Sequence, residues 1–499
     1  MFRSRRATIA AVVAAASLCA CGGGGGGGSM APPTVPGGSA PPQNPVVDGV
    51  RVDVDPFTNP GSQHRTEVEP SAYASGGTIV AAFQTGRFFD AGASDIDFAT
   101  SRDGGASWVS GPLPGTTDIV TPGSAVSAVS DAAVAFDARH GVWLVTSLPV
   151  VAGLRPAGSS ALLINRSTDG ISWAGAVGII PSPDPVDKNW VVCDTHPASP
   201  FYGSCYIEYD DGFGDGVVHM SVSRDGGVTW SAPGETPDLA TGIGGQPLVR
   251  ADGTVVVPYD DDNEAFVNVF LSHDGGASWT GSRPIAPIAA QVEGGDLRSS
   301  PLPGAAMDAS GTAYVTWQDC RYRAHCAFND IVFSRSGDGI AWSQPQPLPN
   351  PNGEDRFIVG LGADPVRPGH LGLTYYAYDD PACASGSCKL RAWFTASPDG
   401  GSTWSAPLAL AGPIALASLP QTAFGRMFGD YVATVYANDS ACSIFVSANA
   451  ASGTTFDEST YARCMTVAGS LSRAQLRSIP AVPLSINGAR WRRRVLPPD

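Results

Sequence analysis

The sequence predicts an all-β protein made of repeated four-stranded sheets, and three observations lead to that prediction. The 499 residues include 60 glycines and 42 prolines but very few lysines, a profile typical of short strands joined by turns. One eight-residue pattern occurs in six related copies along the chain. Between the copies lie β-branched and aromatic runs divided by turn residues, as in residues 246–272.

The repeated pattern is a polar turn that ends in tryptophan and reads SRDGGASW from Ser101. The aspartates of the six copies are Asp103, Asp169, Asp225, Asp274, Asp338 and Asp399, and they are spaced 49 to 66 residues apart. A repeat of this length holds four strands with their loops. Because such a sheet cannot bury both faces alone, we predict that the units stack radially as the blades of a β-propeller.

The number of units favours seven blades, with six as the alternative. After the sixth copy, residues 425–466 contain three further strands but no seventh turn of this kind. The stretch RVDVDPF, which begins at Arg51, would supply the missing fourth strand and close the ring. We place the propeller at residues 47–470 and interpret residues 471–499 as a basic tail that packs on acidic surface.

The first 20 residues predict a lipoprotein signal peptide. Three arginines precede an apolar run that is too short to span a membrane. The run ends in LCAC, which resembles the lipobox of bacterial lipoproteins and implies lipidation of Cys21; a plain cleaved signal is the alternative. Residues 21–46 are rich in glycine and proline and predict a tether. We therefore expect an exported protein at the outer membrane, the cell surface or the periplasm, attached to the membrane through its lipid alone.

Charge and cysteine usage narrow the classes of partner and ligand. The formal net charge of −16 argues against nucleic acid and anionic membrane surfaces as partners. Eight cysteines outside the signal form four neighbouring pairs, for which we predict local disulfides: Cys193 and Cys205, Cys320 and Cys326, Cys383 and Cys388, and Cys442 and Cys464. Zinc is disfavoured because no CxxC pair is present and the seven histidines are scattered.

The turn pattern SxDxGx[ST]W resembles the Asp-box, or BNR repeat, of the sialidase superfamily. Its copies cover the chain from about residue 65 to 470, and in that family the boxes lie on the propeller face away from the active site. Aspartate accepts N–H groups across a tight turn, glycine adopts positive φ, and tryptophan packs between sheets. We interpret the six box aspartates as structural and expect the site among the loops of the opposite face.

The first unit carries the resemblance to sialidases furthest. EPSAYASGGTIVAAFQTGR followed by DIDFATSRDGGASW resembles the opening of that family, which implies Arg87 as a substrate-binding residue and Asp90 or Asp95 as the acid/base. The family uses a tyrosine nucleophile activated by a glutamate. By position, Tyr431 is the candidate nucleophile, and Glu208 and Glu293 are alternatives for its partner. Further substrate-binding candidates in the same set of loops are Asp187, Arg298, Arg356 and Arg426.

One departure from the family bears directly on activity. Where sialidases place the first arginine of their carboxylate-binding triad, this chain has Val68 between Glu67 and Glu69. Guanidinium groups bind a sugar carboxylate bidentately, whereas two glutamates would repel it. Arg65, or a substitute clamp built from the later arginines, would have to replace the missing group.

Two functions therefore remain open from the sequence. The first is a surface-tethered sialidase-like propeller that recognises terminal sugars of glycans and, as an exo-α-sialidase-like glycoside hydrolase, cleaves them. The second is a non-catalytic propeller that binds a glycan or a protein at its mouth. No cofactor is expected, although clustered aspartates such as residues 260–262 leave calcium as an alternative. We expect a monomer whose partner is a glycan or glycoprotein.

Overall fold

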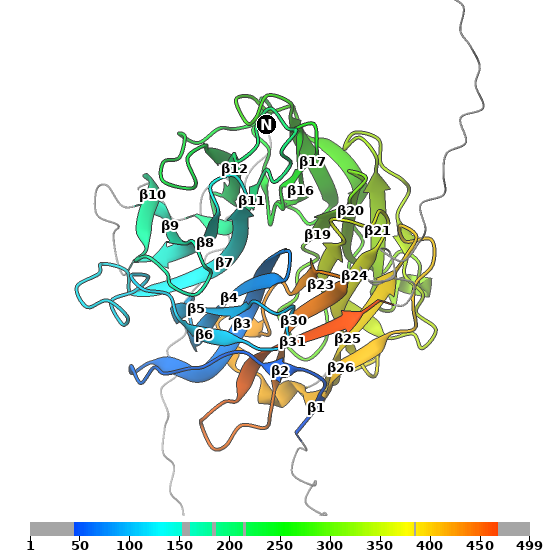
Figure 1. The fold of residues 1–499 in the computed structure, drawn as a ribbon. Helices are drawn as coiled ribbons and strands as arrows, with labels where there is room; N and C mark the ends of the chain where they lie inside the picture. Colours follow the sequence, from blue (N-terminus) through cyan, green and yellow to red (C-terminus); the bar gives the residue numbers. More distant parts are fainter. Residues whose placement is uncertain (1–43, 152–159, 182–185, 213–215, 384–385, 468–499) are drawn as a thin grey trace, which may run out of the picture. The chain divides into compact units, whose positions relative to one another are not determined.

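The computed structural model describes residues 44–467, apart from 152–159, 182–185, 213–215 and 384–385 (Figure 1). The expected signal peptide with Cys21, tether residues 21–43 and the basic tail lie outside this part. The described residues are all-β, with two short 3-10 turns at Ala324–Cys326 and Leu416–Ser418. Among them, no helix has the length and apolar character needed to cross a membrane.

The strands form successive antiparallel groups along the chain. The first three groups are β3 (Ser62–Ser75), β4 (Thr78–Phe88), β5 (Ala93–Ser101) and β6 (Val109–Pro112); β7 (Ala128–Asp137), β8 (Val142–Val150), β9 (Ser160–Ser167) and β10 (Val177–Pro181); and β11 (Asp187–Cys193), β12 (Cys205–Asp210) and β13 (Val218–Ser223). The fourth group contains β14 (Gly242–Ile243), β15 (Leu248–Val249), β16 (Val255–Asp261), β17 (Phe266–Ser272) and β18 (Arg283–Pro287). Within each group, neighbouring strands in the sequence pair with one another, except that β14 and β15 both pair with β16.

The later groups follow the same order. They are β19 (Gly304–Met307), β20 (Ala313–Asp319), β21 (Asp330–Ser336) and β22 (Gln346–Pro347); β23 (Asp355–Ala363), β24 (Leu371–Tyr378), β25 (Lys389–Ser397) and β26 (Leu408–Ala415); and β29 (Ala433–Ala437), β30 (Ser440–Ala448) and β31 (Glu458–Thr466). Between the last two lies a small hairpin of β27 (Gln421–Thr422) and β28 (Gly425–Arg426). Each group contains the meander that the sequence repeat predicts.

Successive groups contact one another through their first strands. Strand β3 lies against β7, β7 against β11, and the succession continues through β15, β19, β23 and β29. Strand β29 also contacts β3, so the last group lies beside the first. Figure 1 follows this order by colour, from the blue β3 through the green β16 to the orange β31.

The N-terminal residues pair with the outer edges of the last two groups. Strand β2 (Val50–Arg51) pairs with β31, so the stretch at Arg51 supplies an outer strand to this group, as predicted. Strand β1 (Val46–Val47), which we did not predict, pairs with β26. Between β2 and β3, Val52 is 2 % exposed and its N–H donates to the carbonyl of Thr460 at 2.9 Å. This short segment therefore links the edges of two groups.

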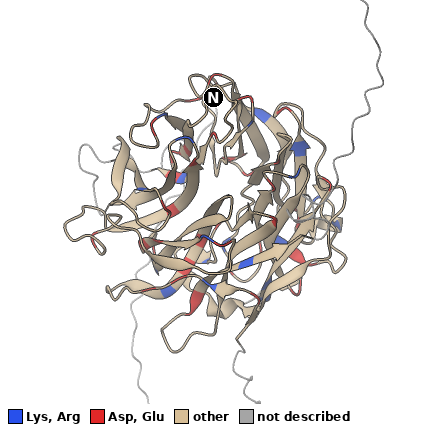
Figure 2. Cartoon of the chain, viewed as in Figure 1, with Lys and Arg blue, Asp and Glu red and all other residues tan. Residues whose placement is uncertain are grey.

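Most strands are covered on both faces, because each group lies between two others. Every residue of β5 (ASDIDFATS) and β20 (AYVTWQD) is buried, the polar residues included. Three of the largest fully buried side chains are Tyr206, Tyr259 and Trp317. Acidic (red) and basic (blue) positions occur within the strands as well as in the loops (Figure 2). Several of these charges are buried and must be paired or neutral.

The six Asp-box turns share one hydrogen-bond pattern. In the first, Asp103 Oδ1 accepts the N–H groups of Ala106 and Ser107 at 3.0 and 2.9 Å, and Oδ2 accepts the Ser107 hydroxyl at 2.5 Å. The other box aspartates accept N–H groups at equivalent positions: Asp169, Asp225, Asp274, Asp338 and Asp399. The Ser107 hydroxyl and the N–H donors lower the pKa of Asp103 to about 2. These carboxylates are occupied within their own turns.

Arginine side chains join each group to a turn of the next. Each donates to a backbone carbonyl of the following group at 2.7 or 2.8 Å: Arg102 to Asp169, Arg166 to Gly226, Arg224 to Gly275, Arg250 to Gly311 and Arg335 to Gly400. Disulfides form within the four neighbouring cysteine pairs, Cys193–Cys205, Cys320–Cys326, Cys383–Cys388 and Cys442–Cys464. The arginine bonds tie neighbouring sheets together, and the disulfides tie strands or loops within one sheet.

Candidate functional site

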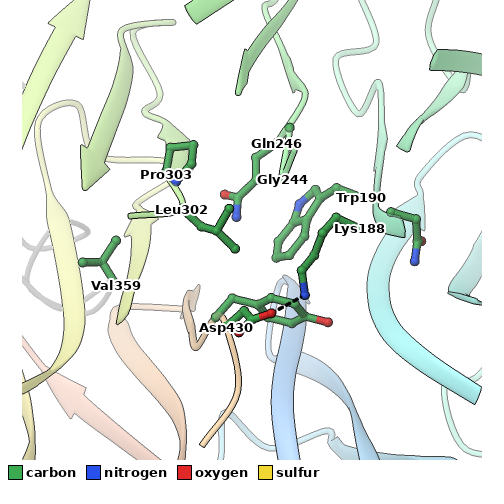
Figure 3. A pocket seen from close by; sticks show the side chains of 11 residues that line it. Lys188, Trp190, Gly244, Gln246, Leu302, Pro303, Val359 and Asp430 are labelled. Atoms are coloured by element: carbon green, nitrogen blue, oxygen red, sulfur yellow. Dashed lines mark hydrogen bonds and ion pairs between the residues drawn. The ribbon is translucent and has the colours of Figure 1, made fainter. Parts of the chain in front are cut away.

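A buried lysine lies among three carboxylates, and the four residues come from four separate segments of the chain. Lys188 Nζ is 2.6 Å from Asp430 Oδ2, 2.9 Å from Asp131 Oδ1 and 3.4 Å from Glu69 Oε1. The lysine side chain is 7 % exposed, and those of the three carboxylates are no more than 8 % exposed. Figure 3 shows Lys188 directed at Asp430. We call these four residues the Lys188 cluster.

Backbone irregularities at equivalent places in β3, β7 and β11, the first strands of their groups, position this cluster. Glu69, Asp131 and Lys188 have φ values of 55°, 50° and 37°, which non-glycine residues rarely adopt. At each of them the pairing register shifts, as at a β-bulge. A bulge bends the strand and redirects a side chain. The local strain therefore accompanies three side chains that converge on one point, and such strain is typical of functional sites.

Two arginines lie beside the cluster. The guanidinium of Arg298 forms an ion pair with Asp430. Arg87 Nη1 donates to Gln84 Oε1 at 2.9 Å, and the Gln84 amide donates to Glu69. Burial lowers the pKa of the 3 % exposed Arg87. The cations of the site are thus tied to protein oxygens and are not available as a free clamp for an anion.

The surroundings separate the pKa values of the two neighbouring carboxylates. Burial raises the pKa of Glu69 to about 7, although Lys188 acts in the opposite direction. Burial also disfavours the Asp430 anion, but Lys188 and Arg298 outweigh it and hold the pKa of Asp430 below its usual value. The two residues touch, since the N–H of Asp430 donates to Glu69 Oε1 at 3.1 Å. Near pH 7, one carboxyl is partly protonated beside one that is ionised.

Tyr431 forms part of the wall of the site. Its ring packs edge-on against Trp190 at a centroid distance of 5.5 Å, and its hydroxyl donates to the carbonyl of Ala132 at 3.4 Å. Burial, followed by the charges of Glu69 and Asp131, raises its pKa well above the usual value. A tyrosine nucleophile needs the opposite environment, because its reactive form is the phenolate.

The cavity beside the cluster is small. Its lining includes Lys188, Trp190, Leu302, Asp430 and Tyr431 (Figure 3), and its volume is about 20 Å³. A space of this size holds about one water molecule. A sugar ring does not fit inside it, so a ligand of that size must approach from the outer surface.

The outer surface above the cluster carries two exposed aromatic rings. Phe424 is 63 % exposed, and Phe89 is 49 % exposed. Their loops are joined by the N–H of Ala423, which donates to the carbonyl of Phe89 at 2.9 Å. The guanidinium carbon of Arg298 lies 5.5 Å from the centroid of the Phe424 ring, and its side chain is 27 % exposed. We call Phe89, Phe424 and Arg298 the aromatic rim.

Four of the predicted site residues lie in or beside this region. They are Arg87, Asp187, Arg298 and Tyr431. Asp187 Oδ1 accepts the N–H of Lys188 at 2.9 Å, and burial together with Asp131 raises its pKa. Of the two acid/base candidates, Asp90 is exposed in the turn after β4, whereas Asp95 is fully buried in β5 and accepts the Thr116 hydroxyl.

The structure does not bring the predicted arginine clamp together. Arg356 is 1 % exposed and donates to the carbonyl of Pro349 and to Glu354 at 2.9 and 3.0 Å. The backbone of Arg426 pairs with the segment before Arg298, and its guanidinium donates to a carbonyl of the preceding loop at 2.8 Å. Arg65 pairs with Asp457 at 2.6 Å, away from the cluster. Of the three clamp candidates, only Arg298 reaches the cluster.

Lys188 and Asp131 were not among the site residues predicted from the sequence. Lys188 is one of two lysines in the chain, and this rarity was a usable signal. Asp131 carried a weaker signal. It is an acidic residue inside an apolar strand, and it occupies in the second unit the position that Glu69 occupies in the first. The charges of Glu69, Asp131, Lys188 and Asp430 all affect the pKa of Tyr431. Neither predicted partner is among these charges: Glu293 accepts the amides of Gln318 and Asn329, and Glu208 lies against Gly245, which lines the cavity.

The acidic loops do not form a metal-binding arrangement in the described part of the chain. No group of three or more histidine, cysteine, aspartate or glutamate side chains is placed there to hold an ion. In the cluster considered for calcium, burial raises the pKa of Asp260 to about 9.

We expect the protein to be most stable at mildly acidic pH and to lose stability as the pH rises to 9. Burial raises the pKa of Glu69 to about 7, of Glu293 to about 8 and of Asp260 to about 9, against usual values of 4.5 for glutamate and 3.8 for aspartate. The folded state therefore retains protons that the unfolded chain releases, so rising pH favours unfolding across this range. Melting temperatures measured from pH 4.5 to 9 test this.

A matched variant isolates one contribution to this pH dependence. Glu293 Oε1 accepts two amide hydrogen bonds, which the oxygen of a glutamine can also accept. Glu293→Gln should therefore flatten the decline between pH 4.5 and 8 while leaving the fold intact. A melting temperature that increases from pH 5 to 9 would refute the prediction.

The comparison with protein families agrees with the repeated turns. Residues 210–411 match the family model described as a BNR repeat-like domain. This part of the chain contains a BNR repeat-like domain. Four of its six box aspartates fall within the match, namely Asp225, Asp274, Asp338 and Asp399. No match was found among the curated proteins.

Solved structures similar to this chain include a sialidase, a polysaccharide lyase and an intramolecular trans-sialidase. The Hadza microbial sialidase Hz136 has a TM-score of 0.45 and 17 % identity over 63 % of this chain and 64 % of its own, so the present chain spans just under two thirds of its length. A polysaccharide lyase, PL25 ulvan lyase, has a TM-score of 0.48 and 12 % identity over 80 % and 94 % of the two chains. The leech intramolecular trans-sialidase has a TM-score of 0.40 and 14 % identity over 84 % and 70 %.

Proposed function

We propose that this protein is a seven-bladed β-propeller that recognises glycans at the aromatic rim. The closed succession of first-strand contacts and the pairing of β2 with β31 support the blade number. The signal pattern supports an exported chain that lipidation of Cys21 and the following tether would hold at the cell surface. Each strand group would then form one blade, with β2 completing the last.

The exposure of Phe89 and Phe424 next to Arg298 is the observation that carries the proposal. Large exposed aromatic rings mark interaction sites when they occur together with polar groups. The apolar face of a sugar ring packs on an aromatic side chain, while its hydroxyls hydrogen-bond to neighbouring polar atoms. Asp296 and Gln421 supply such atoms beside the rim and bond each other at 2.7 Å. The BNR repeats support a glycan-directed function at the level of the family.

We propose that the sugar bound at the rim is neutral. Lys188 is surrounded by three carboxylates, and Arg298 is paired with Asp430. A sugar carboxylate would have to displace these ion pairs, and separating a buried charge from its partner is costly. The absence of an arginine clamp at the Lys188 cluster, within the described residues, disfavours sialoside cleavage at this place.

A binding experiment tests the proposal. A soluble chain starting at Asn44 should bind neutral glycans on an array, and Phe424→Ala should weaken the binding of the best ligand at least tenfold. Val366→Ala is the control, because this side chain is 65 % exposed in the turn between β23 and β24, away from the rim. Wild-type affinity in Phe424→Ala, or turnover of a fluorogenic sialoside, would contradict the proposal.

A further inference from the structure

Two grooves lie on the side of the molecule formed by the Asp-box turns, each next to the box turn of the following strand group. The first also borders the outer part of its own group, within residues 333–349, whereas the second borders the box turn of its own group, within residues 222–231. One is lined by Arg335, Gln344, Gln346 and Trp404 among others and has a volume of about 360 Å³. The other is lined by Arg224, Asp225, Trp230 and neighbours and has a volume of about 440 Å³. We call them the Trp404 groove and the Trp230 groove; both volumes are within the usual range for small-molecule sites.

The Trp404 groove contains a cation but no carboxylate. Its lining residues include Arg335 and no aspartate or glutamate, in a chain whose net charge is −16. Arg335 is exposed and makes no ion pair within the described part of the chain. Its Nη1 donates to the carbonyl of Gly400 at 2.8 Å. That bond fixes the side chain and leaves the Nε–Nη2 edge of the guanidinium free to donate to a ligand. This edge is the fork that binds two oxygens of one anion.

The other walls of the Trp404 groove suit a sugar ring. Trp404 is half-buried and is held by an edge-on contact with Phe333 at 5.9 Å. The side chains of Gln344 and Gln346 are exposed and offer amide donors and acceptors. Thr403 contributes a hydroxyl at the box turn. An aromatic face, amides and one oriented guanidinium together match a ligand with an apolar ring face, hydroxyls and a negative group.

We propose that the Trp404 groove binds one anionic sugar residue, with Arg335 holding its carboxylate or sulfate group. This site is separate from the aromatic rim, where the cations are already paired. Because it lies on the Asp-box side, it gives the chain a second glycan contact, which prefers an anionic sugar where the rim prefers a neutral one. A chain with both sites engages a glycan that carries neutral and acidic residues.

The Trp230 groove is a natural control for this inference. Its arginine, Arg224, uses Nη1 on Ser204 Oγ at 3.0 Å and Nη2 on the carbonyl of Gly275 at 2.8 Å, so neither edge of the fork is free. Asp225 adds a carboxylate to its lining. An anion is therefore repelled there and finds no bidentate donor. Both grooves border the box turn of the following group, and they differ in the chemistry that the proposal needs.

Titrations of the soluble chain with D-glucuronate, glucose 6-sulfate and glucose test the proposal. At low salt, calorimetry or ligand-observed NMR should show that at least one of the two anionic sugars binds at least tenfold more tightly than glucose, and the tighter of them identifies the preferred anion. Arg335→Gln should weaken its binding at least tenfold, whereas Arg224→Gln and Phe424→Ala should leave it unchanged. Rising ionic strength should weaken it as well.

A second variant separates recognition from folding. Arg335→Gln also removes the hydrogen bond to the carbonyl of Gly400 and could therefore affect folding. Gln344→Ala is tested beside it, because the exposed Gln344 side chain lies in the groove and packs against no core cluster. Gln344→Ala should weaken the binding of the anionic sugar severalfold with an unchanged melting temperature. The proposal is overturned if neither anionic sugar is preferred over glucose, if Arg335→Gln binds as the wild type does, or if Arg224→Gln loses binding equally.

Discussion

Replacing Lys188 with methionine is expected to lower the free energy of unfolding by about 3–5 kcal/mol at pH 8. The change removes the one cation that touches all three carboxylates of the cluster, each of which is nearly inaccessible to water. Unpaired buried carboxylates must either remain charged at high cost or take up protons. Urea denaturation followed by tryptophan fluorescence measures the loss.

The pH dependence of this variant and a second lysine provide its controls. At pH 4.5 protons neutralise part of the cluster, so the difference between Lys188→Met and the wild type should shrink. Lys389→Met changes the other lysine of the chain, which is exposed at the start of β25, and should alter stability by less than about 0.5 kcal/mol. Equal effects of the two substitutions at pH 8 would refute the central role of Lys188.

Removing the N-terminal residues up to Asp53 is expected to destabilise the protein by about 3 kcal/mol or more. The burial of Val52 alone contributes about 1.5–3 kcal/mol. Each hydrogen bond that β1, β2 and Val52 make with β26 and β31 adds about 1 kcal/mol. The loss also exposes two strand edges, and exposed edges promote association between chains.

Denaturation and size-exclusion chromatography of a chain starting at Val54 check this expectation. The truncated chain should unfold at lower urea concentration and elute partly as larger species. Val52→Ala should reproduce a part of the loss, whereas Val50→Ala, at a side chain that is 50 % exposed, should have little effect. Unfolding of the truncated chain at the same urea concentration as the full one would show that the segment does not close the structure.

The repeated architecture was predictable because turn chemistry is local. An aspartate that accepts N–H groups three and four residues ahead, with glycines at positive φ, forms the same turn wherever it is written. Strands β16 and β17 were equally readable, because their β-branched runs are long and end at clear turn residues. Strand β1 was not, since two residues in a proline-rich segment carry no pattern and pair only when β26 is already formed.

Some residues of the candidate site were predictable, but their contacts were not. Arg298 and Tyr431, both selected from the sequence, lie in or beside the Lys188 cluster. The direction of a long side chain depends on partners far away in the sequence. Arg356 is held by Glu354 and the ring of Tyr375, and the guanidinium of Arg426 bonds a local carbonyl. No spacing rule predicts these contacts.

The sequence by itself determined the repeat, the box turns, the four cysteine pairs and the replacement of an expected arginine by Val68 between two glutamates. Only the tertiary structure decided what those acidic residues do. Glu69, Asp131 and Lys188 meet because bulges in separate strands turn their side chains to one point, where Asp430 also lies. Ionisation there depends on burial and on charges far apart in the chain, and the sequence order alone contains neither.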